Sequence, residues 1–215
     1  MRVFIGIDPR QPIAYNVLRW SIERRAHKPV QVLPLILPQL PVARRGLTDF
    51  TFSRYLPPYL CGFKGISVFM DSDMLCLYDV HELRDFVTGD HPVYVVKGKE
   101  RFEWPSMMVF DNAQCMQLAP EWIDDEANKP QTLEWASSIG DLPSEWNHCI
   151  GYDEPRTDAK LVHYTMGIPE FPELADCEYS DEWRKERESM LKNPPWLALH
   201  GKSVHAKKVL PRFFE

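Results

Sequence analysis

The order of apolar runs in the first 37 residues constrains the fold more than any other feature of this sequence. Residues 3–7 (VFIGI) form a nearly continuous apolar run, which is typical of a strand buried in a parallel sheet. Apolar side chains then recur at helical spacing over residues 13–26, and residues 30–37 return to an apolar run. This order predicts a β-α-β unit, and therefore an α/β fold with a mostly parallel central sheet flanked by helices.

Further apolar runs predict more strands of this sheet. We expect strands at 66–70, 93–96, 107–110 and 160–163, and helices over 79–87 and 181–191. Pro34 interrupts the second strand, and because proline cannot donate to a central ladder, this strand is expected at a sheet edge or a bulge. A chain of 215 residues suffices for one domain, so we expect a single domain over 1–200 and a basic tail over 201–215.

Charge, cysteine usage and hydropathy argue against several classes of protein. Acidic residues outnumber basic ones by 31 to 25, so the molecule as a whole does not attract nucleic acid. The five cysteines are scattered and include no CxxC pair, which argues against a zinc site or a disulfide framework built from them. No apolar run approaches the length of a transmembrane helix, and no signal-peptide core precedes the first strand. We therefore expect a cytoplasmic protein without a membrane span.

Asp71 and Asp73 follow the strand expected at 66–70, and only the small Ser72 separates them. In open α/β sheets, ligands bind beyond the carboxyl ends of the strands. Alternation along an extended segment points both carboxylates the same way, and a hard divalent cation relieves their repulsion. Such a cation, bridging two phosphates, neutralises the charge that develops on a departing nucleoside diphosphate. The pair therefore predicts a metal site at the end of the third strand.

Two other interpretations of the aspartate pair are possible. The pair could be a solvated turn at the end of a strand. Phosphatases of the haloacid-dehalogenase type also carry a strand followed by D-x-D-x-[T/V], in which the first aspartate is the nucleophile. Here Leu75 stands where threonine or valine is expected, and that motif usually opens the chain instead of lying at residue 71.

Several segments of the chain resemble the retaining glycosyltransferases of family 8, the glycogenin and lipopolysaccharide-galactosyltransferase group. In the order of the family, they are the first strand at 3–8, the arginine-bearing segment at 52–57, the strand and aspartate pair at 66–73, the LPxxWN element at 142–147 and the His-plus-Gly element at 161–167. The resemblance covers about residues 2–171. It implies a GT-A-like, Rossmann-like nucleotide-binding domain of a short bacterial or phage-type branch, which transfers a sugar from a UDP-sugar donor with retention of configuration.

The resemblance also implies roles for individual residues. Asp71 and Asp73 would bind Mn²⁺ or Mg²⁺ with His163 as the third ligand, and a nitrogen ligand beside two carboxylates suits Mn²⁺ better. The residues expected to bind the donor are Asp8 at the base or ribose, Arg54 at the carboxylates and sugar, Ser72 between the aspartates, and Gly167 at the pyrophosphate. No catalytic side chain is identified, and the candidates in the right part of the chain are Glu103, Gln131 and Asp141.

The chain departs from the family pattern at two places. Family members often carry a lysine a few residues after the glycine, but residues 168–171 contain none. The phosphate charge could instead be met by Lys97, Lys99, Arg101, Lys207 or Lys208. The family's Asn-Ser-Gly segment is replaced by residues 104–106 (WPS), in which Trp104 and Ser106 are expected to border the sugar pocket.

The sequence is compatible with several acceptors and with one rival function. Glycans, proteins and modified nucleic-acid bases all fit as acceptors, and the oligomeric state is unknown from sequence. The rival function is a catalytically silent module that binds sugar nucleotides or carbohydrates on the same scaffold. Intact Asp71, Asp73 and His163 argue against it, because a silent site has no need to hold repelling carboxylates together.

Overall fold

The computed structural model of the chain describes residues 1–98 and 100–192. Its centre is a six-stranded sheet with the order β2-β1-β3-β6-β5-β7. These strands are β1 (Arg2–Gly6), β2 (Gln31–Leu35), β3 (Ile66–Asp71), β5 (Val93–Val95), β6 (Met107–Asp111) and β7 (Ile139–Asp141). Within this sheet β6 runs antiparallel to β3 and β5, whereas the other neighbouring strands pair in parallel. The α/β class and the mostly parallel central sheet are confirmed.

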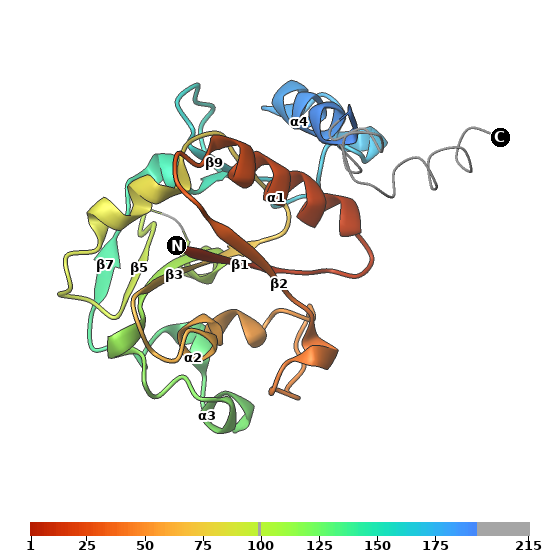
Figure 1. Cartoon of the computed structure of the whole chain (residues 1–215). Helices are drawn as coiled ribbons and strands as arrows, with labels where there is room; N and C mark the ends of the chain where they lie inside the picture. The colour runs from red at the N-terminus through yellow and green to blue at the C-terminus, as the bar shows by residue number, and fades with distance from the viewer. Residues whose placement is uncertain (99, 193–215) are drawn as a thin grey trace, which may run out of the picture.

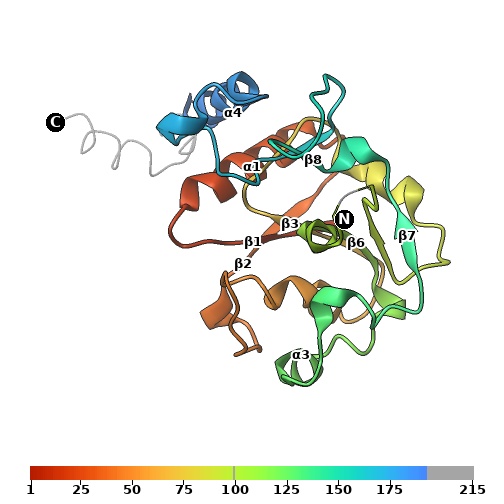
Figure 2. The same cartoon turned by 180° about the vertical axis from the view of Figure 1, so that it is seen from behind.

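Helices cover both faces of this sheet (Figure 1). The α-helices are α1 (Pro12–Arg25), α2 (Pro57–Leu60), α3 (Pro120–Asp124) and α4 (Ser180–Lys192). Helix α1 lies on one face with α4 outside it, α2 and α3 lie on the other face, and the view from behind shows the same layers (Figure 2). Side chains of β1 alternate accordingly, because Val3 and Ile5 belong to the core beneath α1 and Phe4 to the opposite core.

A second, three-stranded sheet with the order β4-β9-β8 lies beyond the end of β3. Its strands are β4 (Met74–Cys76), β8 (His148–Cys149) and β9 (Leu161–His163). Strand β9 runs antiparallel to β4 with His163 opposite Met74, and parallel to β8 with His163 opposite Cys149. Strands β4, β7 and β8 were not predicted. Strands β7 (IGD) and β8 (HC) carry no apolar run, and the apolar residues of β4 follow directly on the aspartate pair.

Short 3-10 helices make most of the remaining connections. They are η1 (Leu37–Gln39), η2 (Ser53–Tyr55), η3 (Val80–Phe86), η4 (Arg101–Ser106), η5 (Asn112–Gln114), η6 (Pro130–Thr132), η7 (Ser144–Trp146) and η8 (Pro172–Leu174). The helix expected over 79–87 is thus η3, and the helix expected over 181–191 is α4. Pro34 lies in the edge strand β2, as predicted. The expected boundary at residue 200 and the tail over 201–215 lie outside the described residues.

A buried carboxylate fixes α4 on α1. Glu186 is 4% exposed, and its oxygens lie 3.2 Å from Arg24 Nε and 2.5 Å from an Arg25 guanidinium nitrogen. Trp183 of the same helix is fully buried in a cluster with Val17 of α1 and with residues of β9. Helices α1 and α4 therefore share one apolar cluster with the small sheet. In the part of the chain that the structure describes, no helix has the length and apolar character to cross a membrane.

Candidate active site

The two aspartates lie at the carboxyl edge of the central sheet. Strands β1 and β3 run in parallel with Gly6 opposite Asp71, so the loop that follows β1 and the end of β3 meet at the same edge. The chain turns at residues 72–73 and enters β4 at Met74. This is the edge at which ligands bind in open α/β sheets.

Pairing between β4 and β9 brings His163 to the aspartates. His163 lies opposite Met74, the residue that follows Asp73, and the backbone N–H of Tyr164 donates to the carbonyl oxygen of Asp73 at 2.9 Å. His163 Nε2 lies 3.5 Å from Asp73 Oδ1. One possible ligand atom from each of Asp71, Asp73 and His163 falls within 4.8 Å of the others. The three side chains expected as metal ligands therefore converge.

The donor set fits a divalent cation. Asp71 and His163 are 9% and 3% exposed, and both Asp71 Oδ1 and Asp73 Oδ1 are buried without a hydrogen-bond donor. Buried carboxylate oxygens that accept no hydrogen bond are costly, and a cation with two carboxylates and one imidazole as ligands would reduce that cost.

Arg54 in η2 holds the first of these carboxylates. Its Nη2 lies 3.2 Å from Asp71 Oδ1, although the geometry of this ion pair is not that of a hydrogen bond. Its Nη1 donates to the carbonyl oxygen of Pro105 at 2.9 Å, and its Nε donates to that of Phe50 at 3.3 Å. Only 13% of the side chain is exposed. The planar guanidinium is thus fixed at three points, which a lysine in its place does not reproduce.

The cluster retains protons when no cation is bound. Burial raises the pKa of Asp71 to about 7, and the nearby Asp73 adds to this rise, against the opposing effect of Arg54. Burial alone lowers the pKa of His163, but the carboxylates of Asp73 and Asp71 raise it well above its ordinary value. The proximity of these carboxylates therefore favours the protonated forms of Asp71 and His163. A cation would compete with those protons for the same ligand atoms.

The second ring nitrogen of His163 faces another carboxylate. His163 Nδ1 lies 3.7 Å from Glu103 Oε2 and 3.8 Å from Cys149 Sγ. Metal-binding histidines usually direct their other nitrogen to a carboxylate or carbonyl, which fixes the ring and its tautomer. Glu103, expected among the catalytic candidates, therefore lies where it can orient His163. Cys149 was not predicted, since its proximity depends on the unpredicted strand β8.

Asp8 and Asp141 have partners of their own in the structure. The Asp8 carboxylate accepts hydrogen bonds from the backbone N–H of Arg10 at 2.9 Å and from its guanidinium at 2.7 Å. Asp141 lies in β7, where its Oδ1 accepts from the backbone N–H of Lys97 at 3.0 Å. Neither carboxylate belongs to the cluster of Asp71, Asp73 and His163. The roles of Asp8 in donor binding and of Asp141 in catalysis stay predictions.

Gly167 and Ser72 are confined by packing. Gly167 has a φ of 123°, and a Cβ at this position would lie 2.8 Å from Phe171 Cδ2. A glycine is therefore required here for backbone and packing reasons. Ser72 is 4% exposed in the turn between β3 and β4. Their expected contacts with a donor stay predictions.

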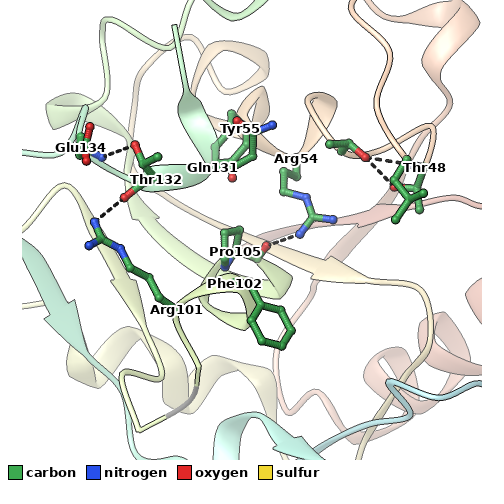
Figure 3. A pocket seen from close by; sticks show the side chains of 11 residues that line it. Thr48, Arg54, Tyr55, Arg101, Phe102, Pro105, Gln131, Thr132 and Glu134 are labelled. Atoms are coloured by element: carbon green, nitrogen blue, oxygen red, sulfur yellow. Dashed lines mark hydrogen bonds between the residues drawn. The ribbon is translucent and has the colours of Figure 1, made fainter.

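Arg54 also lines a pocket of about 580 Å³ (Figure 3). Gln131 and Phe102 contribute to its wall, and Arg101 donates to the carbonyl oxygen of Thr132 at 2.8 Å. The complete lining consists of Leu47, Thr48, Thr51, Arg54, Tyr55, Arg101, Phe102, Pro105, Gln131, Thr132 and Glu134. The pocket thus combines apolar walls with hydroxyl, amide and charged groups, as ligand sites commonly do.

The segment expected to border a sugar pocket, residues 104–106, contributes Pro105 to the lining of this pocket. Phe102 and Pro105 line the pocket beside Arg54, whereas Ser106 is 3% exposed and donates to the carbonyl oxygen of Glu103 at 2.6 Å. Trp104 is not among the lining residues. Of the basic residues expected at the phosphates, Lys99, Lys207 and Lys208 lie outside the described residues.

Sequence comparison identifies one well-matched relative. The chain is 32% identical to Protein CDI of Arabidopsis thaliana over 224 residues, and the alignment covers 87% of this chain and 86% of that protein. This chain belongs to the family of Protein CDI. No family model matches the sequence.

Solved structures place this member of the CDI family among the GT-A glycosyltransferase folds. The bifunctional glycosyltransferase WbbM has a TM-score of 0.63 and 19% sequence identity, and the match covers 91% of this chain. This chain spans 50% of the length of WbbM. The galactosyltransferase LgtC, solved with donor and acceptor sugar analogues, has a TM-score of 0.58 and 12% identity over 88% of this chain and 96% of its own. The expected GT-A-like fold is therefore confirmed.

Proposed function

We propose that this protein is a metal-dependent glycosyltransferase that transfers a sugar from a nucleoside-diphosphate donor, with UDP as the nucleotide. The convergence of Asp71, Asp73 and His163 at the carboxyl edge of a GT-A fold is the observation that carries this proposal. Asp71 Oδ1 and Asp73 Oδ1 are buried and accept no hydrogen bond, which supports a cation at this place. The GT-A fold also argues against the phosphatase interpretation of the aspartate pair.

We propose Mn²⁺ as the natural ion, because two carboxylates and one imidazole suit it better than Mg²⁺. Once bound, the ion would supply positive charge that offsets the charge growing on the departing diphosphate. Asp71 and Asp73 hold the ion at the strand end, Arg54 holds Asp71 in place, and Glu103 orients the imidazole of His163. These residues bind and orient, which is the larger part of catalysis in group transfer from phosphates.

The pocket beside Arg54 is proposed to receive the donor sugar. Arg54 links it to the metal site, since the same guanidinium lines the pocket and pairs with Asp71. Gln131 and the hydroxyls of Thr48 and Thr51 offer hydrogen-bonding groups for sugar hydroxyls. Retention of configuration is proposed from the resemblance to family 8, with attack on the same face as the leaving group and assistance from a departing phosphate oxygen.

The acceptor is proposed to approach from the open side of this pocket. Leu47 and Phe102 stand on its wall and are 96% and 65% exposed, so they offer apolar surface to an incoming molecule. The proposed acceptor is a glycan, a protein side chain or a modified nucleic-acid base. An acceptor screen with a UDP-sugar donor would select among them.

The decisive test is a thermal-shift and turnover experiment with UDP and UDP-sugars, with and without Mn²⁺. A ligand that binds only the native state raises the melting temperature, so UDP with Mn²⁺ should stabilise the wild-type protein. Asp73→Asn should abolish the Mn²⁺-dependent part of this shift, whereas Asp158→Asn, a change at a side chain 73% exposed, should leave it intact.

Turnover separates the enzyme from the silent module. Slow Mn²⁺-dependent hydrolysis of a UDP-sugar by the wild type, lost in Asp73→Asn, is the expected result. A shift with UDP but no hydrolysis of any donor would favour the silent binding module. If UDP with Mn²⁺ gives no shift, or if the shift persists in Asp73→Asn, the assignment of this site is wrong.

A further inference from the structure

A second cluster of metal-ligating side chains lies outside the candidate active site. His27 follows α1 in the connection to β2, Asp79 immediately precedes η3, and His81 is in the first turn of η3. His27 and Asp79 are 52 residues apart in the sequence. One possible ligand atom from each of the three side chains falls within 4.8 Å of the others.

The backbone fixes the carboxylate of Asp79 at the centre of this cluster. Asp79 Oδ2 accepts a hydrogen bond from the backbone N–H of His27 at 3.0 Å, and Oδ1 accepts one from that of His81 at 2.9 Å. Each oxygen therefore has a backbone donor, supplied by the residue whose imidazole also approaches it. The carboxylate would keep its position whether or not the two rings donate to it.

Both imidazoles direct the same ring nitrogen to this carboxylate. His81 Nδ1 lies 2.9 Å from Asp79 Oδ1, and His27 Nδ1 contacts Asp79 Oδ2. The two rings meet edge to face with 5.1 Å between their centroids. Two nitrogens and one carboxylate thus point to a common region from two separate segments of the chain.

The cluster is buried on the side of His81 and Asp79 and open to solvent on the side of His27. The side chains of His81 and Asp79 are 8% and 17% exposed, whereas that of His27 is 55% exposed. The three residues line a hollow of about 650 Å³, so solvent reaches the cluster from the side of His27. Burial alone raises the pKa of Asp79, but the backbone N–H groups and imidazoles of His81 and His27 hold it well below its ordinary value. The carboxylate is therefore ionised at neutral pH.

The remaining charges around the hollow are nearly balanced. Lys28 and Arg84 contribute positive charge, and Asp85 and Glu82 contribute negative charge. Glu82 is engaged by Lys160, whose Nζ lies 2.8 Å from its Oε2. A cation in the hollow would therefore be held mainly by Asp79 and the two imidazoles, and not by a general negative field.

We propose that His27, Asp79 and His81 form a second metal site, which binds a divalent transition-metal ion such as Zn²⁺. Two imidazoles and one carboxylate are the ligands of zinc in many proteins that leave the fourth position to water, and imidazole favours Zn²⁺ over Mg²⁺ or Ca²⁺. Binding requires each Nδ1 to present its lone pair, so a proton must leave any imidazole that donates to Asp79. The bound ion would tie the α1–β2 connection to η3.

The alternative is that the imidazoles only donate hydrogen bonds to a structural carboxylate. Equilibrium dialysis of the full chain against Zn²⁺ separates the two, with Asp71→Asn/Asp73→Asn as the background that removes two ligands of the active-site cluster. We expect His27→Gln to remove one equivalent of bound Zn²⁺, or to weaken its binding at least tenfold, and His81→Gln to do the same. His163, Cys149 and Glu103 could also hold a metal ion in this background. Zn²⁺ bound there would be retained by both His27→Gln and His81→Gln, and is recognised in that way.

Two controls address binding by other histidines. His91, whose Nδ1 lies 2.8 Å from Ser138 Oγ, is changed in His91→Gln, and the tail is changed in His200→Gln/His205→Gln. Neither control should alter the equivalent that His27→Gln removes. The proposal is overturned if His27→Gln, at an exposed and replaceable side chain, leaves Zn²⁺ stoichiometry and affinity unchanged. It is equally overturned if the tail variant removes the equivalent instead.

A thermal-shift measurement provides an independent readout. Zn²⁺ at 100 times its dissociation constant should raise the melting temperature of the Asp71→Asn/Asp73→Asn protein by roughly 5–10 °C. The same Zn²⁺ should give a smaller rise after His27→Gln, and an equal rise would contradict the proposal. Failure here leaves the proposed glycosyl transfer untouched, because His27→Gln in the wild-type background should retain the UDP and Mn²⁺ shift.

Discussion

The guanidinium of Arg54 lies 3.2 Å from the carboxylate of Asp71, and this pair joins the cluster of candidate metal ligands to the adjacent pocket. The same side chain donates at 2.9 Å to the carbonyl oxygen of Pro105, in the 3-10 helix that also carries Glu103. A single side chain thus contacts both a candidate metal ligand and the segment that carries Glu103.

Arg54→Lys should slow Mn²⁺-dependent hydrolysis of a UDP-sugar by about one to two orders of magnitude, because small displacements of positioning groups are costly. Lysine retains the charge but cannot reach Asp71 and Pro105 together. The rate under saturating donor is the measurement. Arg45→Lys, at a side chain 73% exposed, is the matched control and should retain the wild-type rate. Equal rates in the two variants would refute a positioning role for Arg54.

Glu103→Gln should weaken Mn²⁺ binding by about 10–100-fold, the usual effect of removing the carboxylate behind a metal-binding histidine. Its Oε2 lies 3.7 Å from His163 Nδ1, and the neutral amide orients the ring less strongly. Titration with Mn²⁺ followed by electron paramagnetic resonance gives the dissociation constant. Glu100→Gln, at an exposed residue that precedes η4, should leave it unchanged. A loss of turnover without a change in Mn²⁺ affinity would instead place Glu103 at the substrate.

Mn²⁺ affinity should rise as the pH increases from 6 to 8. Burial raises the pKa of Asp71 to about 7, and the carboxylates of Asp73 and Asp71 raise that of His163 despite its burial. Both groups are therefore protonated at the acidic end, and the ion must displace those protons. The gain should be up to about tenfold per pH unit for each proton displaced. Calorimetry in buffers of different ionisation enthalpy measures the proton release, and a pH-independent affinity with no release would contradict this account.

Gly167→Ala should destabilise the fold by about 1–3 kcal/mol, the usual cost of a backbone conformation that suits only glycine. Its φ is 123°, and an added Cβ would lie 2.8 Å from Phe171 Cδ2. Urea denaturation measures the free energy of unfolding. Gly98→Ala, where a Cβ meets no atom within 4 Å, should change it by less than about 0.5 kcal/mol. If Gly167→Ala also weakens UDP binding under conditions where it is folded, the expected contact with the pyrophosphate gains support.

The sequence predicted the long elements of the main sheet and its helices. The β-α-β start and the strand that ends at Asp71 carry apolar runs of five or more residues, and helices α1 and α4 carry recognisable patterns. Strands β4, β7 and β8 have two or three residues each, so their pairing depends on tertiary contacts that no local pattern records. The antiparallel direction of β6 was likewise not predicted, since an apolar run does not encode strand direction.

The candidate site could be predicted only in part. Asp71 and Asp73 follow from their place at a strand end, whereas His163 was included through the family resemblance and not through spacing. Its approach to Asp73 depends on the pairing of β4 with β9. The orienting position of Glu103 depends on how η4 folds back over the sheet, and nothing in its neighbouring residues indicates this. The cluster of His27, Asp79 and His81 was missed for the same reason, because the segments that form it lie far apart in the chain.

The register of β4 against β9 has a consequence for the order in which this protein matures. A growing chain that has passed residue 150 already contains Asp71 and Asp73, but it lacks the imidazole of His163, which enters only with β9. Capture of an ion through all three ligands must therefore wait until β9 has docked beside β4. Ion uptake would then report the docking of β9, and a nascent or truncated product ending before β9 would remain without that signal.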